Sequence, residues 1–349
     1  MEFWDVLSPD TSDLQFRASR DRYGGQPLFS ERFPGLWAGA RSTHGVTRGR
    51  VCFQARVSQI LPGKEGSSEV WRTGNSRNSG KASERASYGF DGRGLKVENG
   101  KFQEFGESFG ESDVIGCFAD FEDPSLVSLS FSKNGRDLGA AFRVRKDSLR
   151  ERALLPHVLC KGCAVELNFG QRPEPLAPVP DGFLFIHHIP APDRVRTPPG
   201  PKSTEECEVL LMVGLPGSGK TQWAQKHSQE NREKRYNILG TERVLHQLTL
   251  LTQQAAQCLS KLVQIAPRAR RNFILDQVSR EKHREWREKE RGWREKIAGM
   301  AGKNSREWKS SQKIPGKHPK KSWIKIPKNP GKRPKKSQKI QEIIPKNLG

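Results

Sequence analysis

The first half of the chain consists of short apolar runs separated by turn residues. Between about residues 15 and 190, Gly, Pro, Asn and Asp interrupt the sequence, and the runs between them are rich in β-branched and aromatic residues. Several runs alternate apolar and polar positions, which places one face of a strand in a core and the other in water. Many short strands of this kind predict an antiparallel β-sandwich. The clearest runs are Val51–Val57, Asp113–Phe118, Leu126–Phe131 and Ala164–Phe169.

Two stretches modify this pattern locally. Asn134-Gly135 predicts a tight hairpin turn after Phe131, because both residues tolerate the positive φ angles that such a turn needs. Between Val70 and Tyr88 the sequence is dominated by Ser, Arg, Asn and Gly, and it predicts no buried strand. An incomplete sandwich is therefore expected at this point.

The cysteines indicate a reducing compartment. Six of them are spread over about two hundred residues without the dense spacing of a disulfide framework. Cys160 and Cys163 have the spacing of a metal-ligand pair, but no second pair stands nearby to complete four ligands. We expect these two residues to flank a hairpin turn, and no metal is assigned to them.

Five motifs in this region follow one another in the order of a known domain. They are Asp21-Arg-Tyr-Gly-Gly-Gln-Pro-Leu28, Tyr88-Gly-Phe-Asp-Gly92, Asp113-Val-Ile-Gly-Cys-Phe118, Ser130-Phe-Ser-Lys-Asn-Gly135 and Leu155-Pro-His-Val158. Together they resemble the SPRY domain of the heterogeneous nuclear ribonucleoprotein U family, closest to its U-like branch. The resemblance implies a domain over residues 15–190 that binds partner proteins, here nuclear proteins, and does not catalyse a reaction.

A phosphate-binding loop follows the Pro-rich stretch 191–205, which is expected to be a linker. The apolar run Glu208–Val213 is typical of a strand buried in a parallel sheet, and it leads into Gly214-Leu-Pro-Gly-Ser-Gly-Lys-Thr221. The glycines let backbone N–H groups surround a phosphate, the lysine adds positive charge, and the threonine supplies an oxygen to Mg²⁺. The motif predicts binding of ATP or another nucleoside triphosphate with Mg²⁺ at Gly214, Gly217, Ser218, Gly219, Lys220 and Thr221. An empty loop with a purely structural role is the alternative.

Two further elements support this second domain, residues 206–278. Leu251–Ala266 has apolar positions at three- and four-residue spacings and predicts an amphipathic helix. Asn272–Asp276 predicts a buried strand that ends in a carboxylate, so Asp276 is the candidate to help Thr221 hold Mg²⁺, although a strand-terminal Asp is more often only a turn or cap.

The second domain resembles the P-loop domain of the same family, which is similar to polynucleotide kinases. In those kinases the stretch equivalent to Tyr236-Asn-Ile is followed by a catalytic aspartate, whereas this chain has Thr241 there, next to Glu242. A threonine is not a general base near neutral pH. The lid arginines and remaining strands are also missing after Asp276. We therefore expect an incomplete α/β domain that binds nucleotide, with no catalytic residue assigned.

Residues 279–349 form a strongly basic tail. They contain 23 Lys or Arg and 7 Asp or Glu, and so carry +16 of the chain's net charge of +22. Arg-Glu-Lys recurs every seven residues from Arg280 and predicts a solvated helix, whereas the Pro- and Lys-rich repeats after Lys309 predict disorder. Such a tail neutralises RNA or DNA phosphates without sequence preference. The candidate nucleic-acid-binding and nuclear-import residues are Lys332, Arg333, Lys335 and Lys336. The repeats are equally compatible with an alternative exon or mispredicted coding sequence.

These observations favour a multi-domain nuclear protein that binds RNA or ribonucleoprotein complexes, with a β-sandwich, an incomplete P-loop domain and a basic tail. No apolar run approaches the length of a membrane span and the N-terminus lacks a secretory pattern, so no membrane partner is expected. One alternative is a polynucleotide-kinase-like phosphotransferase. Another is an adaptor that acts through the sandwich alone.

Overall fold

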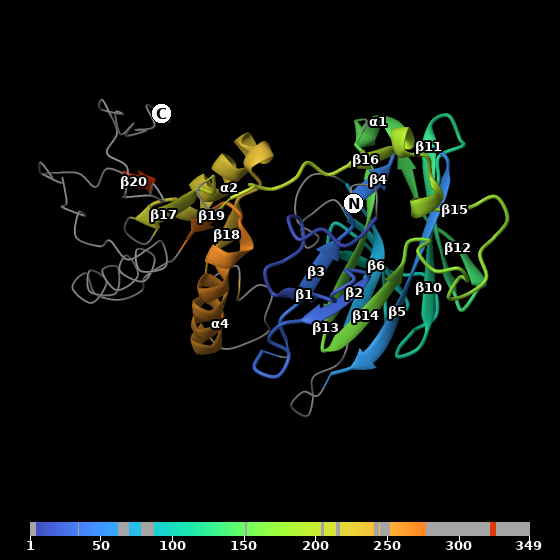
Figure 1. The fold of residues 1–349 in the computed structure, drawn as a ribbon, viewed down its shortest axis with the longest axis horizontal. Coiled ribbons are helices and arrows are strands. Elements are labelled where there is room, and N and C mark those ends of the chain that lie inside the picture. Colours follow the sequence, from blue (N-terminus) through green and yellow to red (C-terminus); the bar gives the residue numbers. More distant parts are fainter. Residues whose placement is uncertain are drawn as a thin grey trace, which may run out of the picture. The chain divides into compact units, whose positions relative to one another are not determined.

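The computed structural model describes residues 5–33, 35–61, 70–77, 87–150, 152–203, 206–213, 217–240, 244, 252–276 and 322–325. The chain divides into two compact units, which are considered separately (Figure 1). The first comprises Met1–Pro199 with Gln247–Thr249, and the second comprises Gly200–His246 with Leu250–Gly349.

Two sheets form the first unit, and they confirm the predicted β-sandwich. The first sheet has the order β1 (Phe16–Ala18), β2 (Gly24–Pro27), β14 (Cys163–Asn168), β5 (Arg50–Ile60), β10 (Val114–Asp120), β11 (Leu126–Lys133) and β12 (Arg136–Arg145), with β15 (Leu184–Phe185) beside β5. The second has the order β16 (Arg194–Arg196), β4 (His44–Val46), β13 (Leu154–Lys161), β6 (Val70–Arg77), β7 (Ser87–Asp91), β8 (Leu95–Glu98) and β9 (Lys101–Glu104), with β3 (Ala38–Arg41) beside β13. The short helices are α1 (Lys146–Leu149), η1 (Ile186–His188) and η2 (Ala191–Asp193).

The alternating runs of the sequence supply the core between these sheets. Phe53, Phe131 and Leu167 from the first sheet and Phe90 and Val158 from the second belong to one buried cluster. All pairings along the two main sheet paths are antiparallel, while β15 joins β5 in parallel. The hairpin turn after β11 is also confirmed, since Asn134 and Gly135 have φ angles of 52° and 85°.

The prediction that residues 71–87 contain no buried strand was wrong for β6. This strand lies inside the second sheet, where it pairs with β13 on one side and β7 on the other. Thr73 is fully buried on β6, and its hydroxyl donates to the carbonyl of His157 at 3.2 Å. Backbone pairing on both sides thus holds a strand whose own composition is polar.

Two other local predictions need correction. Cys160 and Cys163 do not flank a hairpin, because Cys160 is the last residue but one of β13 and Cys163 is the first residue of β14, and these strands belong to different sheets. The chain passes between the sheets through Gly162, which has a φ of 68°. The segment expected to be a linker, 191–205, begins with η2 and with β16, which pairs with β4 and so extends the sandwich.

The second unit contains a small sheet with the order β18 (Asn237–Leu239), β19 (Phe273–Leu275), β17 (Val209–Val213) and β20 (Ser322–Lys325). The first three strands are parallel, as the apolar run before the phosphate-binding loop predicts. The helices are α2 (Lys220–Glu230) and α4 (Thr252–Ile265), with the short η3 (Arg232–Lys234) and η4 (Ala266–Ala269). α4 matches the predicted amphipathic helix. β20 lies in the tail, where irregular chain was expected, and it pairs antiparallel with β17.

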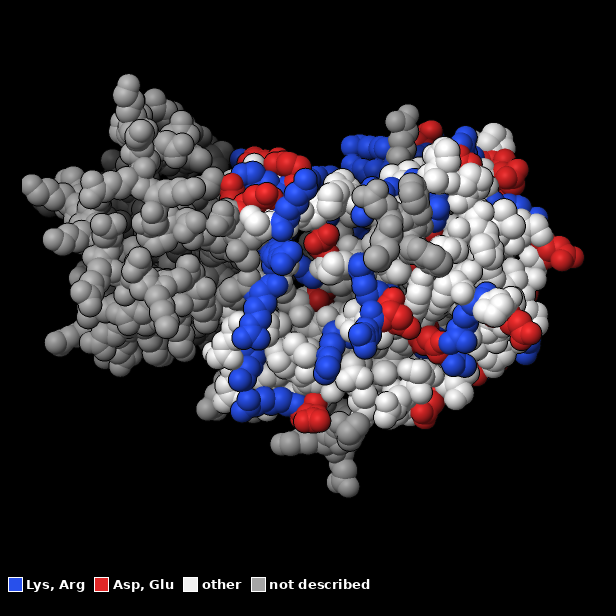
Figure 2. Space-filling model, viewed as in Figure 1, with Lys and Arg blue, Asp and Glu red and all other residues white. Residues whose placement is uncertain are grey.

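Charges of both signs are interspersed on the face of the molecule seen in Figure 2. This mixture agrees with the modest charge that remains outside the tail, since residues 279–349 account for most of the excess. Within the described part of the chain, no helix is both long and apolar enough to cross a membrane.

Candidate nucleotide site

The phosphate-binding loop lies between a buried strand and a helix, as its chemistry requires. β17 ends at Val213, and α2 begins at Lys220 with Gly219 as its N-terminal cap. Gly217 and Gly219 have φ angles of 75° and 77°, which side chains disfavour and which turn the backbone sharply at the start of the helix. The first turn of α2 therefore points its free N–H groups and positive dipole end toward the loop.

The fold brings two charged residues, Lys220 and Asp276, to this end of the sheet. Lys220 is 6% exposed and Asp276, directly after β19, is 5% exposed. Burial lowers the pKa of the Lys220 ammonium, while the negative charge of Asp276 acts in the opposite direction. A bound triphosphate would add negative charge beside this buried cation and would favour its protonated form.

The neighbouring groups fit a nucleotide with its metal ion. The Ser218 hydroxyl is buried and has no hydrogen-bond partner among the described residues, so it is available to a phosphate oxygen. Thr221 occupies the second position of α2 and Asp276 directly follows the adjacent strand β19, as a shared Mg²⁺ site would require. The described residues contain no group of three or more His, Cys, Asp or Glu that could bind a metal alone. A metal ion here would depend on the phosphates for its remaining ligands.

A network of aromatic residues holds α2 against the sheet. The indole of Trp223 stacks on His227 with ring centroids 4.4 Å apart, and His227 lies 5.3 Å from Tyr236. The Tyr236 hydroxyl donates to Glu208, whose carboxylate also accepts from the Lys234 ammonium at 2.9 Å. Burial, followed by this carboxylate, raises the pKa of Tyr236. No sequence pattern predicts this network, because its members come from three separate segments.

Several of the predicted residues lie outside the described part of the chain. They are Gly214 of the loop, Thr241 and Glu242 at the position of the kinase base, and the tail residues Lys332, Arg333, Lys335 and Lys336. Their predicted roles in phosphate binding, proton transfer and nucleic-acid binding stay predictions.

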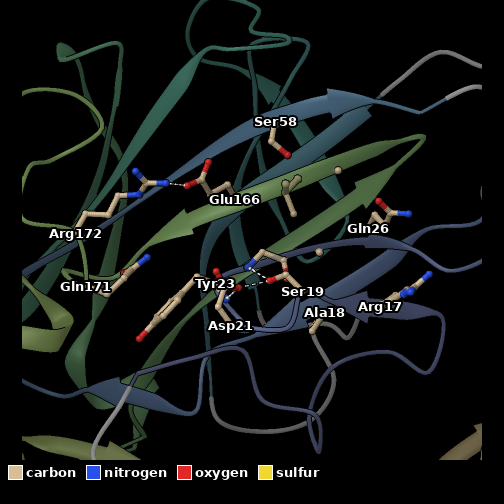
Figure 3. A pocket seen from close by; sticks show the side chains of 14 residues that line it. Arg17, Ala18, Ser19, Asp21, Tyr23, Gln26, Ser58, Glu166, Gln171 and Arg172 are labelled. Carbon is tan, nitrogen blue, oxygen red and sulfur yellow. Dashed lines mark hydrogen bonds and ion pairs between the residues drawn. The ribbon is translucent and has the colours of Figure 1, made fainter.

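A cavity in the first unit was not anticipated. It has a volume of about 660 Å³ and is lined by residues of β1, β2, β14 and the end of β5 (Figure 3). Asp21, Tyr23 and Gln26, from the motif that carried the SPRY resemblance, line it together with Glu166 and Arg172. The Asp21 carboxylate accepts from the Ser19 hydroxyl and the Tyr23 amide, and these bonds lower its pKa. The motif was the signal that could have located this cavity.

Comparison with protein families matches both units. Residues 52–172 match the SPRY domain, and residues 209–302 match an AAA domain that contains the phosphate-binding loop. The predicted SPRY and P-loop regions are confirmed by these matches.

The chain is 63% identical over 292 residues to the human heterogeneous nuclear ribonucleoprotein U-like protein 2, a match that covers 78% of this chain and 39% of that protein. It is 36% identical over 149 residues to the Drosophila melanogaster ATP-dependent RNA helicase Ddx1, covering 42% of this chain and 19% of the helicase. Among solved structures, the SPRY domain of human HERC1 aligns with a TM-score of 0.36 and 18% identity, covering 48% of this chain and 99% of that chain. The chain thus spans about two fifths of the length of the U-like protein.

Proposed function

Since the chain is a relative of the heterogeneous nuclear ribonucleoprotein U-like proteins, as its motifs predicted, we propose that it is a nuclear protein that associates with RNA and ribonucleoprotein complexes. The SPRY domain binds partner proteins, the P-loop unit binds ATP or a related nucleotide with Mg²⁺, and the basic tail binds RNA or DNA phosphates. The name of the relative, the two matched domains and the charge of the tail support this assignment.

The strand, loop and helix around Lys220 carry the nucleotide part of the proposal. Lys220 places a buried cation at the N-terminus of α2, where the backbone N–H groups and the helix dipole also favour an anion. Thr221 and Asp276 would hold Mg²⁺, which would supply positive charge to neutralise the phosphates. These residues bind and orient a nucleotide, and none of them can accept a proton from an attacking hydroxyl without giving up that role.

Binding without turnover follows from the position of the kinase base. Thr241 stands where the similar kinases have an aspartate, and a hydroxyl with an ordinary pKa does not accept a proton near neutral pH. The nucleotide is therefore proposed to act as a ligand that stabilises the second unit. The second candidate function is a polynucleotide-kinase-like activity, because the loop and Asp276 are both present. Glu242 would then act as the base in place of the aspartate.

Fluorescent ATP binding in the presence of Mg²⁺ tests the proposal, with Lys220→Ala as the test variant. Removing the buried cation should weaken binding at least about tenfold, because a charge-assisted phosphate contact contributes about 1.5–3 kcal/mol. Lys226→Ala is the matched control, since Lys226 lies on the same helix with its side chain 69% exposed and 3.9 Å from Glu230. This control should bind ATP like the wild type.

Equal binding by both variants and the wild type would show that the loop does not hold the nucleotide. Transfer of phosphate to a 5′-hydroxyl end by the wild type, lost in Lys220→Ala, would establish the kinase in place of the binding protein. A Glu242→Gln variant would then show whether Glu242 is the base.

A further inference from the structure

A row of cationic and aromatic side chains crosses the outer face of the second sheet. It consists of Trp37, Lys161, Arg72, Arg93 and Phe102, with the carboxylate of Asp91 beneath, and is called the cation–aromatic row below. Arg72 pairs with Leu159 on one neighbouring strand and with Asp91 on the other, so the three side chains share one face of the sheet. Phe90 and Val158 precede Asp91 and Leu159 in sequence and point to the other face, into the core. Side chains of alternate residues share a face, so the row lies on the side of the sheet away from the core.

The centre of the row is a buried carboxylate bound to two guanidinium groups. Asp91 is fully buried and accepts from the Nε atoms of Arg72 and Arg93, each at 2.7 Å. Burial alone would raise the pKa of Asp91, but the hydrogen bonds from Arg93 and Arg72 outweigh it and lower the pKa. Asp91 is therefore ionised and balances one of the two positive charges.

Aromatic rings fix the cations in place. The guanidinium of Arg72 lies over the rings of both Trp37 and Phe102, 4.7 Å from each centroid. Arg93 lies 4.9 Å from the centre of Phe102, and the Lys161 ammonium lies 5.7 Å from the centre of Trp37. Cation–π contacts of this kind hold long side chains in one conformation, so less entropy is lost when an anion binds.

The row has more positive charge than it neutralises internally. Within the row, three cations face one carboxylate, that of Asp91, while Glu104, which the register places on the same side of the sheet, is exposed on the edge strand β9. Burial lowers the pKa of Lys161, and repulsion from Arg93 and Arg72 lowers it further, which is the effect of an excess of positive charge nearby. An anion bound between Arg93 and Lys161 would remove this repulsion.

An exposed strand edge lies beside the row. Among the described residues, β9 pairs with β8 alone, and all four of its residues are exposed. Phe102 on β9 is 42% exposed. The outer edge of β9 can therefore pair with the backbone of another extended segment, the mode known as strand addition.

We propose that the cation–aromatic row and the edge of β9 together bind an acidic segment of a partner protein in an extended conformation. One part of the segment pairs with β9 through its backbone. Because β6, β7 and β8 separate β9 from β13, the residues that follow this part cross the row, and their carboxylate or phosphate groups contact Arg93 and Lys161. This inference rests on the proposed partner-binding role of the SPRY domain and gives that role a location and a ligand chemistry.

A peptide fits the row better than RNA does. Arg72 occupies faces of both aromatic rings, so these faces are not available as platforms for stacked bases. The hydrogen-bonding edge of β9 is complementary to a polypeptide backbone and not to a ribose-phosphate chain. Arginine also forms paired hydrogen bonds with carboxylates, the groups that an acidic peptide presents in sequence.

The test uses the full chain and a fluorescein-labelled peptide in which Glu alternates with Val. Its binding should weaken by about five- to tenfold in Arg93→Gln/Lys161→Gln, as expected for two partly exposed ion pairs. Arg32→Gln/Arg143→Gln removes the same charge at two exposed positions and should change binding less than about twofold. Hydrogen exchange at Lys101–Glu104 should slow when the peptide binds, a local effect that binding to the tail does not produce.

Equal weakening in both double variants, or unchanged exchange at β9, would overturn the proposal. Selective loss of oligo(uridine) binding in Arg93→Gln/Lys161→Gln, without loss of peptide binding, would make the ligand a nucleic acid and would also overturn it. If Arg93→Gln prevents folding, Lys161→Gln alone should still weaken peptide binding by about threefold. If the peptide does not bind at this row but nuclear proteins still co-purify with the chain, the inference about the row is wrong and the proposed function is not affected.

Discussion

At the scale of single residues, the buried His157 makes the stability of the first unit depend on pH. Its side chain is 3% exposed, and burial, assisted by the charge of Arg41, lowers its pKa to about 3. The folded chain therefore keeps His157 neutral, whereas the unfolded chain protonates it near pH 6.5. Stability from this residue is present above about pH 6.5 and is lost as the pH falls toward 3.

We expect urea unfolding at pH 7 and pH 5 to reveal this effect. The free energy of unfolding should fall by about 2 kcal/mol more in the wild type than in His157→Gln, since one proton is taken up over about 1.5 pH units. His188→Gln, which removes an exposed histidine, should retain the wild-type pH dependence. A pH dependence that is the same in wild type and His157→Gln would contradict a neutral buried histidine.

The residues of the nucleotide site differ from those of the cation–aromatic row in how far the sequence reveals them. Lys220 and Thr221 belong to a contiguous motif whose spacing predicts phosphate and Mg²⁺ binding, and Asp276 ends an apolar run. Arg72 and Asp91 stand 19 residues apart, and Trp37 comes from a different strand region. Pairwise contacts between distant segments have no local pattern, so the row could be found only in the folded structure.

At the scale of elements, the hairpin between β11 and β12 gives a direct test of the fold. Gly135 has a φ of 85°, and a Cβ atom added there would lie 2.7 Å from Pro178. Gly139 has nearly the same φ, 83°, but no neighbour within 4 Å of such an atom. Gly139→Ala should destabilise the unit by about 1 kcal/mol through backbone strain alone. Gly135→Ala should cost about 2–3 kcal/mol, because it must also displace the proline.

Chemical denaturation of the two glycine variants measures this difference. Equal losses of unfolding free energy would mean that Pro178 does not pack on the turn in solution. No loss in either variant would contradict the positive φ angles themselves.

The elements that the sequence predicts share a strong local signal. β11, β14 and the Phe53–Val57 part of β5 alternate apolar and polar residues, β10 and β17 have no charged residue before their ends, and the apolar positions of α4 recur at helical spacing. β6 lacks such a signal, because Thr73, its buried side chain among those that the structure describes, is polar and the next residue, Gly74, has no side chain. Its position is determined by backbone bonds to β13, which follows it by more than seventy residues. Local composition contains no information about a partner at that distance.

At the scale of the whole molecule, the charge is concentrated in the part of the chain farthest from the sandwich in sequence. Residues 279–349 carry most of the excess charge, and the cluster Lys332, Arg333, Lys335 and Lys336 contains no acidic residue. If this cluster contacts RNA phosphates, each contact contributes about 0.7 to the slope of log affinity against log salt for a single strand. Replacing all four residues by Gln should therefore lower the magnitude of that slope by up to about 3. Fluorescence anisotropy with oligo(uridine) between about 50 and 200 mM KCl measures it.

A control with the same loss of charge separates phosphate contacts from the general field of the protein. Replacement of four exposed arginines of the first unit by Gln changes the net charge equally, at Arg20, Arg32, Arg143 and Arg196. This control should lower the slope by less than about 1, because counterion release depends on the cations that contact phosphates and not on the total charge. Equal changes in the two variants would mean that the tail cluster attracts RNA only through net charge. If the tail substitutions leave the slope unchanged, RNA binds to other parts of the chain and not to this cluster.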